Sequence, residues 1–329
     1  MNKLLIVLCF GCTAVRAQDS NPVVLTVDVA NLVEYYEDVP ITSFATTPAI
    51  TPQNVGNGKN FFSIVIFADI VAINGQPAKG VYVSNNRVVA GSPTPTPGQA
   101  ITDTAFTGLR EDIFKFLNAD GTSIGSITAL GLSGGVPSPG SAATQTGGDW
   151  VITGGSGAFL GVKGEMGGTG MQKGIRPASM AEDPANRRSN GGGAFQFVMY
   201  LQPASRPQIA TANNAPAVVH ASDFTPVTTA KPAAAGEILA LYASGLGPVQ
   251  PNTAPGKSFP ENPLALANGP VQVTVNGESA PVLAAVGYPG TLGGYQVNFQ
   301  LPSGVTKGTA ALQLGVAWIT GTPVSIAIQ

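Results

Sequence analysis

Three carboxylates and two tyrosines stand together early in the chain, at Glu34, Tyr35, Tyr36, Glu37 and Asp38. Carboxylic acids and phenols exchange protons with bound molecules, so this cluster could support acid–base chemistry without a metal. Consecutive residues of a β-strand point to opposite faces, and therefore at most half of the five can face one side. The cluster either lines a cavity or forms a solvated strand end, and the sequence leaves both open.

Two further residues are candidates for the same cavity. Asp69 interrupts the apolar run 61–73, which makes it either a buried carboxylate with a perturbed pKa or a bulge residue that faces water. Trp150 could line an apolar cavity, or it could fill one, because an eight-stranded barrel is just wide enough for either case. The sequence predicts five cavity residues, with no catalytic role assigned to any of them: Glu34, Tyr36, Asp38, Asp69 and Trp150.

Other residue types that are common in catalytic and metal sites are scarce. The chain has one histidine, His220, so a Ser-His-Asp triad would have to use it, and no nucleophile elbow in a strand-to-helix context accompanies it. Zinc and copper sites usually draw on several histidines or cysteines, and no loop carries the spaced acidic residues of a calcium site. We therefore predict no metal and no cofactor, and we interpret His220 as a linker or domain-edge residue.

The first 17 residues have the pattern of a secretory signal peptide. Lys3 precedes an apolar run from Leu4 to Val15, and small residues favour cleavage before Gln18. The run is too short to anchor the chain across a bilayer. Both cysteines lie within this segment, so the mature chain is expected to have no disulfide. Lipoprotein processing at Cys12 is the alternative, and either route predicts a secreted, periplasmic or cell-surface protein.

The composition indicates an all-β protein and argues against a nucleic-acid partner. Without the two basic residues of the signal peptide, 14 basic residues remain against 18 acidic ones, and no basic stripe follows the chain. Charged residues make up 10% of the chain, whereas glycine (42) and proline (27) are abundant. This balance is typical of a turn-rich β protein.

Alternating apolar patterns predict an antiparallel β-barrel over residues 18–203. About eight strand candidates begin at Val23, and hairpin turns are expected at Asn74-Gly75 and Asp120-Gly121. Eight strands suffice to close a barrel. Between residues 167 and 193 the apolar pattern lapses, which predicts a long mobile loop that is either a lid or a solvated insertion.

The segment 149–164, DWVITGGSGAFLGVKG, joins two strand patterns through a glycine-dense corner. Its glycines suit a bulged hairpin, and a phosphate-binding loop is the alternative, although such a loop needs a following helix. The segment resembles the GGTGxFxGAxG signature of dirigent proteins and allene oxide cyclases, which are small antiparallel barrels. The resemblance implies a cavity with acidic or polar residues from an early strand, comparable in position to Glu34–Asp38.

A second domain is predicted after a linker at residues 204–216. Strand patterns over residues 217–329, among them the clean alternation of 295–301, fit an immunoglobulin-like β-sandwich without the antibody disulfide. This half resembles an uncharacterised C-terminal domain of secreted acidobacterial proteins, through AGEILALYASGLGP at 235–248, VTVNGESAP at 273–281 and GYQVNFQLP at 294–302. The resemblance implies a secreted accessory module and brings no catalytic residues.

Together these patterns predict an exported, non-catalytic protein that binds an apolar small molecule or a component of the cell envelope or the extracellular space. The poverty of catalytic residue types motivates this reading. The alternative is a metal-independent, cyclase-like or dirigent-like barrel that guides cyclisation or radical coupling of an apolar small molecule by shape and a few inward polar groups. An oligomer is compatible with either reading.

Overall fold

The computed structural model describes residues 22–36, 61–89, 107–133, 145–254 and 256–329. These divide into two compact units, Pro22–Ala204 and Ser205–Gln329. Regular structure in the described ranges is almost entirely β-strand, which confirms the predicted all-β class. No helix within those ranges is long and apolar enough to cross a membrane.

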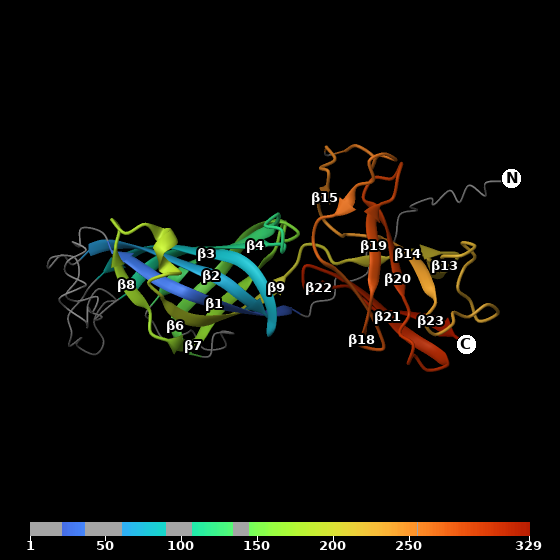
Figure 1. The fold of residues 1–329 in the computed structure, drawn as a ribbon, viewed down its shortest axis with the longest axis horizontal. Helices are drawn as coiled ribbons and strands as arrows, with labels where there is room; N and C mark the ends of the chain where they lie inside the picture. Colours follow the sequence, from blue (N-terminus) through green and yellow to red (C-terminus); the bar gives the residue numbers. More distant parts are fainter. Residues whose placement is uncertain (1–21, 37–60, 90–106, 134–144, 255) are drawn as a thin grey trace. The chain divides into compact units, whose positions relative to one another are not determined.

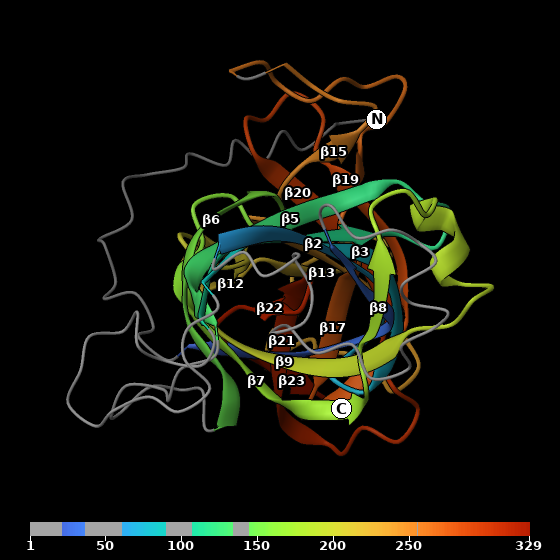
Figure 2. The same cartoon turned by 90° about the vertical axis from the view of Figure 1, so that its left-hand side faces the viewer.

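The first unit is a closed antiparallel barrel of eight strands, as predicted (Figure 2). The ring closes because β1 pairs with both β2 and β9. In ring order the strands are β1 (Val23–Tyr36), β2 (Phe61–Ile73), β3 (Gln76–Val89), β4 (Thr107–Leu117), β5 (Ser123–Ser133), β6 (Gln145–Gly157), β7 (Lys163–Lys173) and β9 (Gly193–Gln202).

The two ends of the barrel differ in their connections. At one end, called the Phe159 end, short turns join the strands, and Asn74 and Gly75 both have positive φ, as a tight hairpin turn requires. At the other end, called the Tyr36 end, β1, β3 and β5 lead into residues 37–60, 90–106 and 134–144, which lie outside the described ranges. The site described below therefore consists of strand residues only.

The glycine-dense corner forms a strand end and a tight turn at the Phe159 end. Gly157 has a φ of +62°, and a Cβ atom at Gly155 would lie 2.6 Å from two backbone oxygens. These glycines allow the turn to fold Phe159 inward, where its side chain is buried against Phe116. No helix follows the corner, which removes the structural context of a phosphate-binding loop.

The prediction of a long loop at residues 167–193 is wrong, because most of this segment forms strands and a 3₁₀ helix. Strand β7 runs to Lys173, β8 covers Arg176–Ser179, and a 3₁₀ helix covers Pro184–Arg187. Strand β8 pairs in parallel with the last four residues of β1, which follow the part of β1 that pairs with β9. The apolar pattern lapses here because glycines occupy many strand positions and because charged pairs, described below, replace apolar packing.

The second unit contains two larger sheets consistent with a sandwich (Figure 1). One sheet is built around β14 (Ile238–Ser244), β20 (Gly294–Gln300) and β19 (Val282–Gly287), with β10 (Gln208–Ile209), β13 (Val218–His220), β15 (Val249–Gln250) and β16 (Leu266–Ala267). The other contains β17 (Val271–Val275), β18 (Glu278–Ala280), β21 (Gly308–Val316), β22 (Ile319–Thr320) and β23 (Val324–Ile328). Alternate residues of both sheets are buried, as period-2 patterns predict.

Residues 204–216 were predicted as a linker, but Ser205–Pro216 belong to this second unit. Strand β10 pairs with β14 through Ile209 and Ala243, and β11 (Thr211–Ala212) forms a hairpin with β12 (Ala215–Pro216). The strands are only two residues long, which is too short for an alternating pattern to be recognised in the sequence.

Candidate functional site: the polar interior of the barrel

Strand register places a set of polar side chains on the inner face of β3 and β4. Tyr82 lies opposite Phe114, Ser84 opposite Asp112, and Asn86 opposite Arg110. Tyr82, Ser84 and Asp112 are completely buried, and Asn86 nearly so. Because residues two apart share a face of a strand, the buried Phe114 and Phe116 fix Asp112 and Arg110 on the same inner face.

Strands β1 and β6 complete this set around the ring. Glu34 lies opposite Ile66, which lies opposite Ser84, so Glu34 shares a layer of the barrel with Ser84 and Asp112. The next layer toward the Tyr36 end holds Tyr36, Asn86 and Arg110, and Trp150 joins Arg110 through Gly131. We call the eight residues the interior polar cluster: Glu34, Tyr36, Tyr82, Ser84, Asn86, Arg110, Asp112 and Trp150.

Arg110 is the hub of this cluster. Its Nη2 donates to the Tyr82 hydroxyl and lies 3.2 Å from Asp112 Oδ1, while its Nε donates to Ser84 Oγ at 3.2 Å. The Tyr82 hydroxyl also donates to Asp112 Oδ1 at 2.5 Å. The guanidinium carbon lies 5.0 Å from the centre of the Trp150 ring, within the range of a cation–π contact.

Glu34 and Tyr36 form the second pair of the cluster. The Tyr36 hydroxyl donates to Glu34 Oε2 at 2.7 Å. Burial raises the pKa of the Glu34 carboxyl above its ordinary 4.5, and the Tyr36 hydrogen bond and the Arg110 charge only partly offset this. Burial and the neighbouring Glu34 raise the pKa of Tyr36, so its phenol stays protonated at neutral pH. The pair therefore presents a phenol and a carboxyl that holds its proton more strongly than usual.

Three buried polar atoms of the cluster have no hydrogen-bond partner among the described residues. They are Asn86 Oδ1, Asp112 Oδ2 and Trp150 Nε1. Such atoms are rare in folded proteins because each costs the free energy of its lost hydration, on the order of 1–3 kcal/mol. Two are acceptors and one is a donor, so a hydroxyl group or a water molecule, which both donates and accepts, has the matching chemistry.

Aromatic side chains fill the barrel beyond this cluster toward the Phe159 end. The Tyr82 ring packs against Phe114 and Phe197, with centroids 4.8 and 4.9 Å apart, and Phe116 packs against Phe159 at 5.0 Å. All five rings are buried. The interior is thus apolar and packed at one end and polar and incompletely hydrogen-bonded nearer the other.

The structure brings three of the five predicted cavity residues together: Glu34, Tyr36 and Trp150 lie in the interior polar cluster. Asp69 lies apart from them, on the outer face of β2, where it binds Arg187, Arg188 and Asn31. Burial tends to raise the pKa of Asp69, but these donors outweigh burial and lower it to about 2. Asp38 lies outside the described residues.

Sequence reasoning missed Arg110, Asp112 and the polar residues of β3. The pattern was available: Arg110, Asp112, Phe114 and Phe116 follow one another at every second position. Two phenylalanines in such a row indicate the inner face, and a charge pair on that face indicates a buried polar site. In strand 107–117, however, exposed residues such as Leu109 and Ile113 are also apolar, which blurred the alternation.

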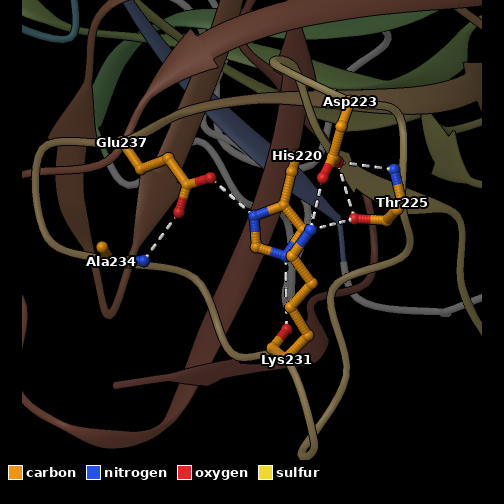
Figure 3. Close-up of polar contacts among 6 residues, drawn as sticks. All are labelled: His220, Asp223, Thr225, Lys231, Ala234 and Glu237. Carbon is orange, nitrogen blue, oxygen red and sulfur yellow. Dashed lines mark hydrogen bonds and ion pairs between the residues drawn. The ribbon is translucent and has the colours of Figure 1, made fainter.

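The lone histidine has a structural environment in the second unit (Figure 3). His220 is buried, its Nδ1 lies 2.5 Å from Glu237 Oε1, and its Nε2 lies 3.3 Å from the Lys231 carbonyl oxygen. Burial raises the pKa of Glu237, but the Ala234 backbone N–H and His220 outweigh it and lower the pKa. Both ring nitrogens of His220 are engaged, so the histidine ties the loop before β14 to β13 and is not placed to activate a nucleophile.

Within the described ranges, no three residues of the His, Cys, Asp and Glu types come together as a metal site. No protein-family model, curated protein or solved structure matches this chain. The interior polar cluster is therefore the feature that points to a function.

Proposed function

We propose that the barrel binds a small, neutral organic molecule through a hydroxyl group seated in the interior polar cluster. The observation that carries this proposal is the group of three buried atoms without partners, Asn86 Oδ1, Asp112 Oδ2 and Trp150 Nε1. A hydroxyl donates to one of the acceptors and accepts from the indole N–H, which removes part of the cost of leaving these atoms unpaired.

The charge of the cluster supports a neutral ligand. Arg110 is the one cation of the cluster and is already engaged by Asp112, Tyr82 and Ser84. An anionic ligand would face two carboxyl groups, Asp112 and Glu34, without an unengaged cation, and burying an unpaired charge is costly. The apolar part of the ligand would pack against aromatic rings such as Trp150, as in most small-molecule sites.

A titration with matched probes tests this proposal. In the full chain, 4-methylphenol and n-hexanol are expected to shift the Trp150 indole N–H resonance in an NMR spectrum, whereas toluene and n-hexane are not. The Trp150→Phe variant assigns that resonance, because the chain has one other tryptophan. Asp112→Asn should weaken the response to both alcohols, while Arg87→Met, on the exposed side of β3, should not. Equal responses to toluene and 4-methylphenol, or none to any probe, would refute hydroxyl binding.

A second candidate function is an enzyme-like role in cyclisation or radical coupling, as the dirigent and allene oxide cyclase resemblance implies. The observation that favours it is the Glu34–Tyr36 pair, because burial raises the pKa of the Glu34 carboxyl and so suits it to act as a proton donor. Stereoselective conversion of an unsaturated lipid epoxide, or stereocontrol over phenoxy-radical coupling by an added oxidant, would support this role. Such activity should disappear in Glu34→Gln, and its absence from the wild-type chain leaves binding as the function.

Export remains part of the proposal. The pattern of residues 1–17 supports it, and the supposed accessory role of residues 217–329 in contacts with the envelope or extracellular material depends on it. N-terminal sequencing of the protein after expression with its leader is expected to begin at Gln18. A diacylglyceryl group on Cys12 would favour the lipoprotein route, and an uncleaved N-terminus in the cytoplasm would contradict export.

A further inference from the structure

A bulge in β1 decides which side chains of this strand face the barrel interior. Before it, Leu25, Val27 and Val29 are buried in the core. The next two pairs with β2 are Ala30 with Asp69 and Val33 with Phe67. Between these pairs β1 advances by three residues and β2 by two, so β1 carries one extra residue. An extra residue reverses the alternation of the strand. Glu34 and Tyr36 consequently face inward, and Val33 and Tyr35 face outward.

Asn31 provides the backbone conformation that the bulge needs. Its φ is +55°, in the left-handed region that asparagine tolerates better than most residues. Its side-chain Nδ2 donates to Asp69 Oδ2 at 3.0 Å. Asp69 itself pairs with Ala30, directly before the bulge. The carboxylate of Asp69 therefore holds the bulge from the neighbouring strand.

The same carboxylate also binds the segment that covers the outer face of the bulge. Arg187 Nη2 lies 2.5 Å from Asp69 Oδ1, and Arg188 donates to both carboxylate oxygens at 2.7 and 2.9 Å. The Asp69 and Arg187 side chains are largely buried, so this ion pair is shielded from solvent. We call residues 176–193 the strap, because they run from β8 to the start of β9 across the outside of β1.

The strap packs against the outward-facing residues of β1, which alternate along the strand with Glu34 and Tyr36. Strand β8 pairs with Val33–Tyr36, and the outward Val33 and Tyr35 form a small apolar core with Ala178 and Phe67. A second ion pair, Arg176 with Glu182, closes the strap on itself with nitrogen and oxygen 2.6 Å apart. A side chain locked on the outer face of a strand fixes the direction of its neighbours on the inner face.

We propose that Asp69 is a positioning residue for the interior polar cluster, acting through the Asn31 bulge and the strap to keep Glu34 and Tyr36 turned into the barrel. The inference rests on the proposed function for its meaning, because the residues positioned belong to the proposed ligand site. Asp69 itself lies on the outer face of the barrel wall, opposite the face that carries the interior polar cluster.

The test measures the orientation of Glu34 in the absence of any ligand. The side-chain carboxyl of Glu34 is titrated by carbon-13 NMR in the wild type, Asp69→Asn and the control Asp28→Asn. Asp28 is the matched control because it too is an outward aspartate on this sheet, bonded to Gln196 Nε2 at 2.7 Å, and it precedes the bulge. In Asp69→Asn the pKa of Glu34 is expected to fall toward its ordinary 4.5 as the side chain reaches solvent, and in Asp28→Asn to stay raised.

Two variants of Asn31 separate the effect of the bulge conformation on Glu34 from a general loss of stability. Asn31→Gly retains access to positive φ but loses the hydrogen bond to Asp69, so it is expected to lower the pKa of Glu34 only in part, whereas Asn31→Val also disfavours the positive φ and is expected to lower the pKa further. An unchanged Glu34 titration in folded Asp69→Asn overturns the proposal. Complete unfolding of the barrel in Asp69→Asn, with Asp28→Asn folded, also overturns it, because Asp69 would then hold the fold and not the orientation. Failure of the alcohols to bind tests the proposed function separately, since this titration needs no ligand.

Discussion

The barrel and the second unit each bury a polar group around one basic side chain, and the two groups differ in how completely they are hydrogen-bonded. In the second unit each ring nitrogen of His220 has an oxygen atom at hydrogen-bonding distance, Glu237 Oε1 for Nδ1 and the Lys231 carbonyl oxygen for Nε2. In the barrel, Arg110 is well bonded, yet three neighbouring atoms have no partner among the described residues. A satisfied buried group contributes to the fold, whereas an incompletely satisfied one indicates a place for a ligand or water.

This contrast shows that the rarity of a residue type is a poor guide to function in this chain. His220 is the residue type most often found in catalytic sites, and here it is a structural tie. The residues that form the proposed site are common types, and only their convergence inside the barrel gives them functional interest. Four predictions test this contrast, in order of decreasing expected effect.

Replacing Arg110 with methionine should have the largest effect on the barrel. Asp112 is fully buried and would lose its counter-charge, which typically costs about 3–5 kcal/mol of unfolding free energy. Urea denaturation followed by barrel-specific resonances measures this cost. The control Arg87→Met removes an exposed arginine from β3 and should be nearly neutral. Equal losses in the two variants would contradict a buried charge pair.

Replacing His220 with leucine should destabilise the second unit by about 2 kcal/mol, because the charge-assisted hydrogen bond between His220 Nδ1 and the Glu237 carboxylate is lost. The barrel should be unaffected. The control Asp223→Asn removes an exposed pair with Lys231, which lies in the same loop, and should change little. Hydrogen exchange of the β13 and β14 amides reports the loss, and unaltered exchange in His220→Leu would show that the histidine is not a structural tie.

The stability of the barrel should depend on the protonation of Glu34. Its folded pKa is raised above 4.5, so between 4.5 and the folded value the native state keeps a proton that the unfolded chain releases. The free energy of unfolding should therefore fall as pH rises through this window. Glu34→Gln should remove that fall, while Arg110, Tyr36 and Asp112 remain in place around it. Urea midpoints across the window check the slope, and identical pH profiles for the two proteins would refute it.

Replacing Trp150 with phenylalanine should have the smallest effect on stability, about 1 kcal/mol, from the lost volume and the weaker contact with Arg110. No hydrogen bond is lost, because the indole N–H has no partner in the described structure. Alcohol binding should weaken nonetheless. Thermal unfolding and the 4-methylphenol titration together measure both effects. A loss above about 3 kcal/mol would indicate that the indole N–H has a structural partner.

Much of the fold was accessible from local patterns. The apolar run 61–73, the Asn74-Gly75 turn and the glycine-dense corner predicted hairpins correctly because hairpin pairing is local and its turns require particular residues. The strap was mistaken for a loop because Arg187 and Arg188 hold it to Asp69, which lies more than a hundred positions earlier in the chain. No local pattern reports such a pairing.

The all-β class, the number of barrel strands and the residue types available for chemistry could be predicted from the chain alone, because strand period and turn preference are properties of short segments. The sequence also placed Glu34, Tyr36 and Trp150 among the candidates. Which of these candidates lie close together depends on the pairing and closure of the strands. The bulge at Asn31 reverses the faces of β1, and ring closure brings Arg110 and Asp112 beside Glu34. Both depend on pairing between strands, and a single extra residue in one strand changes the direction of every side chain after it.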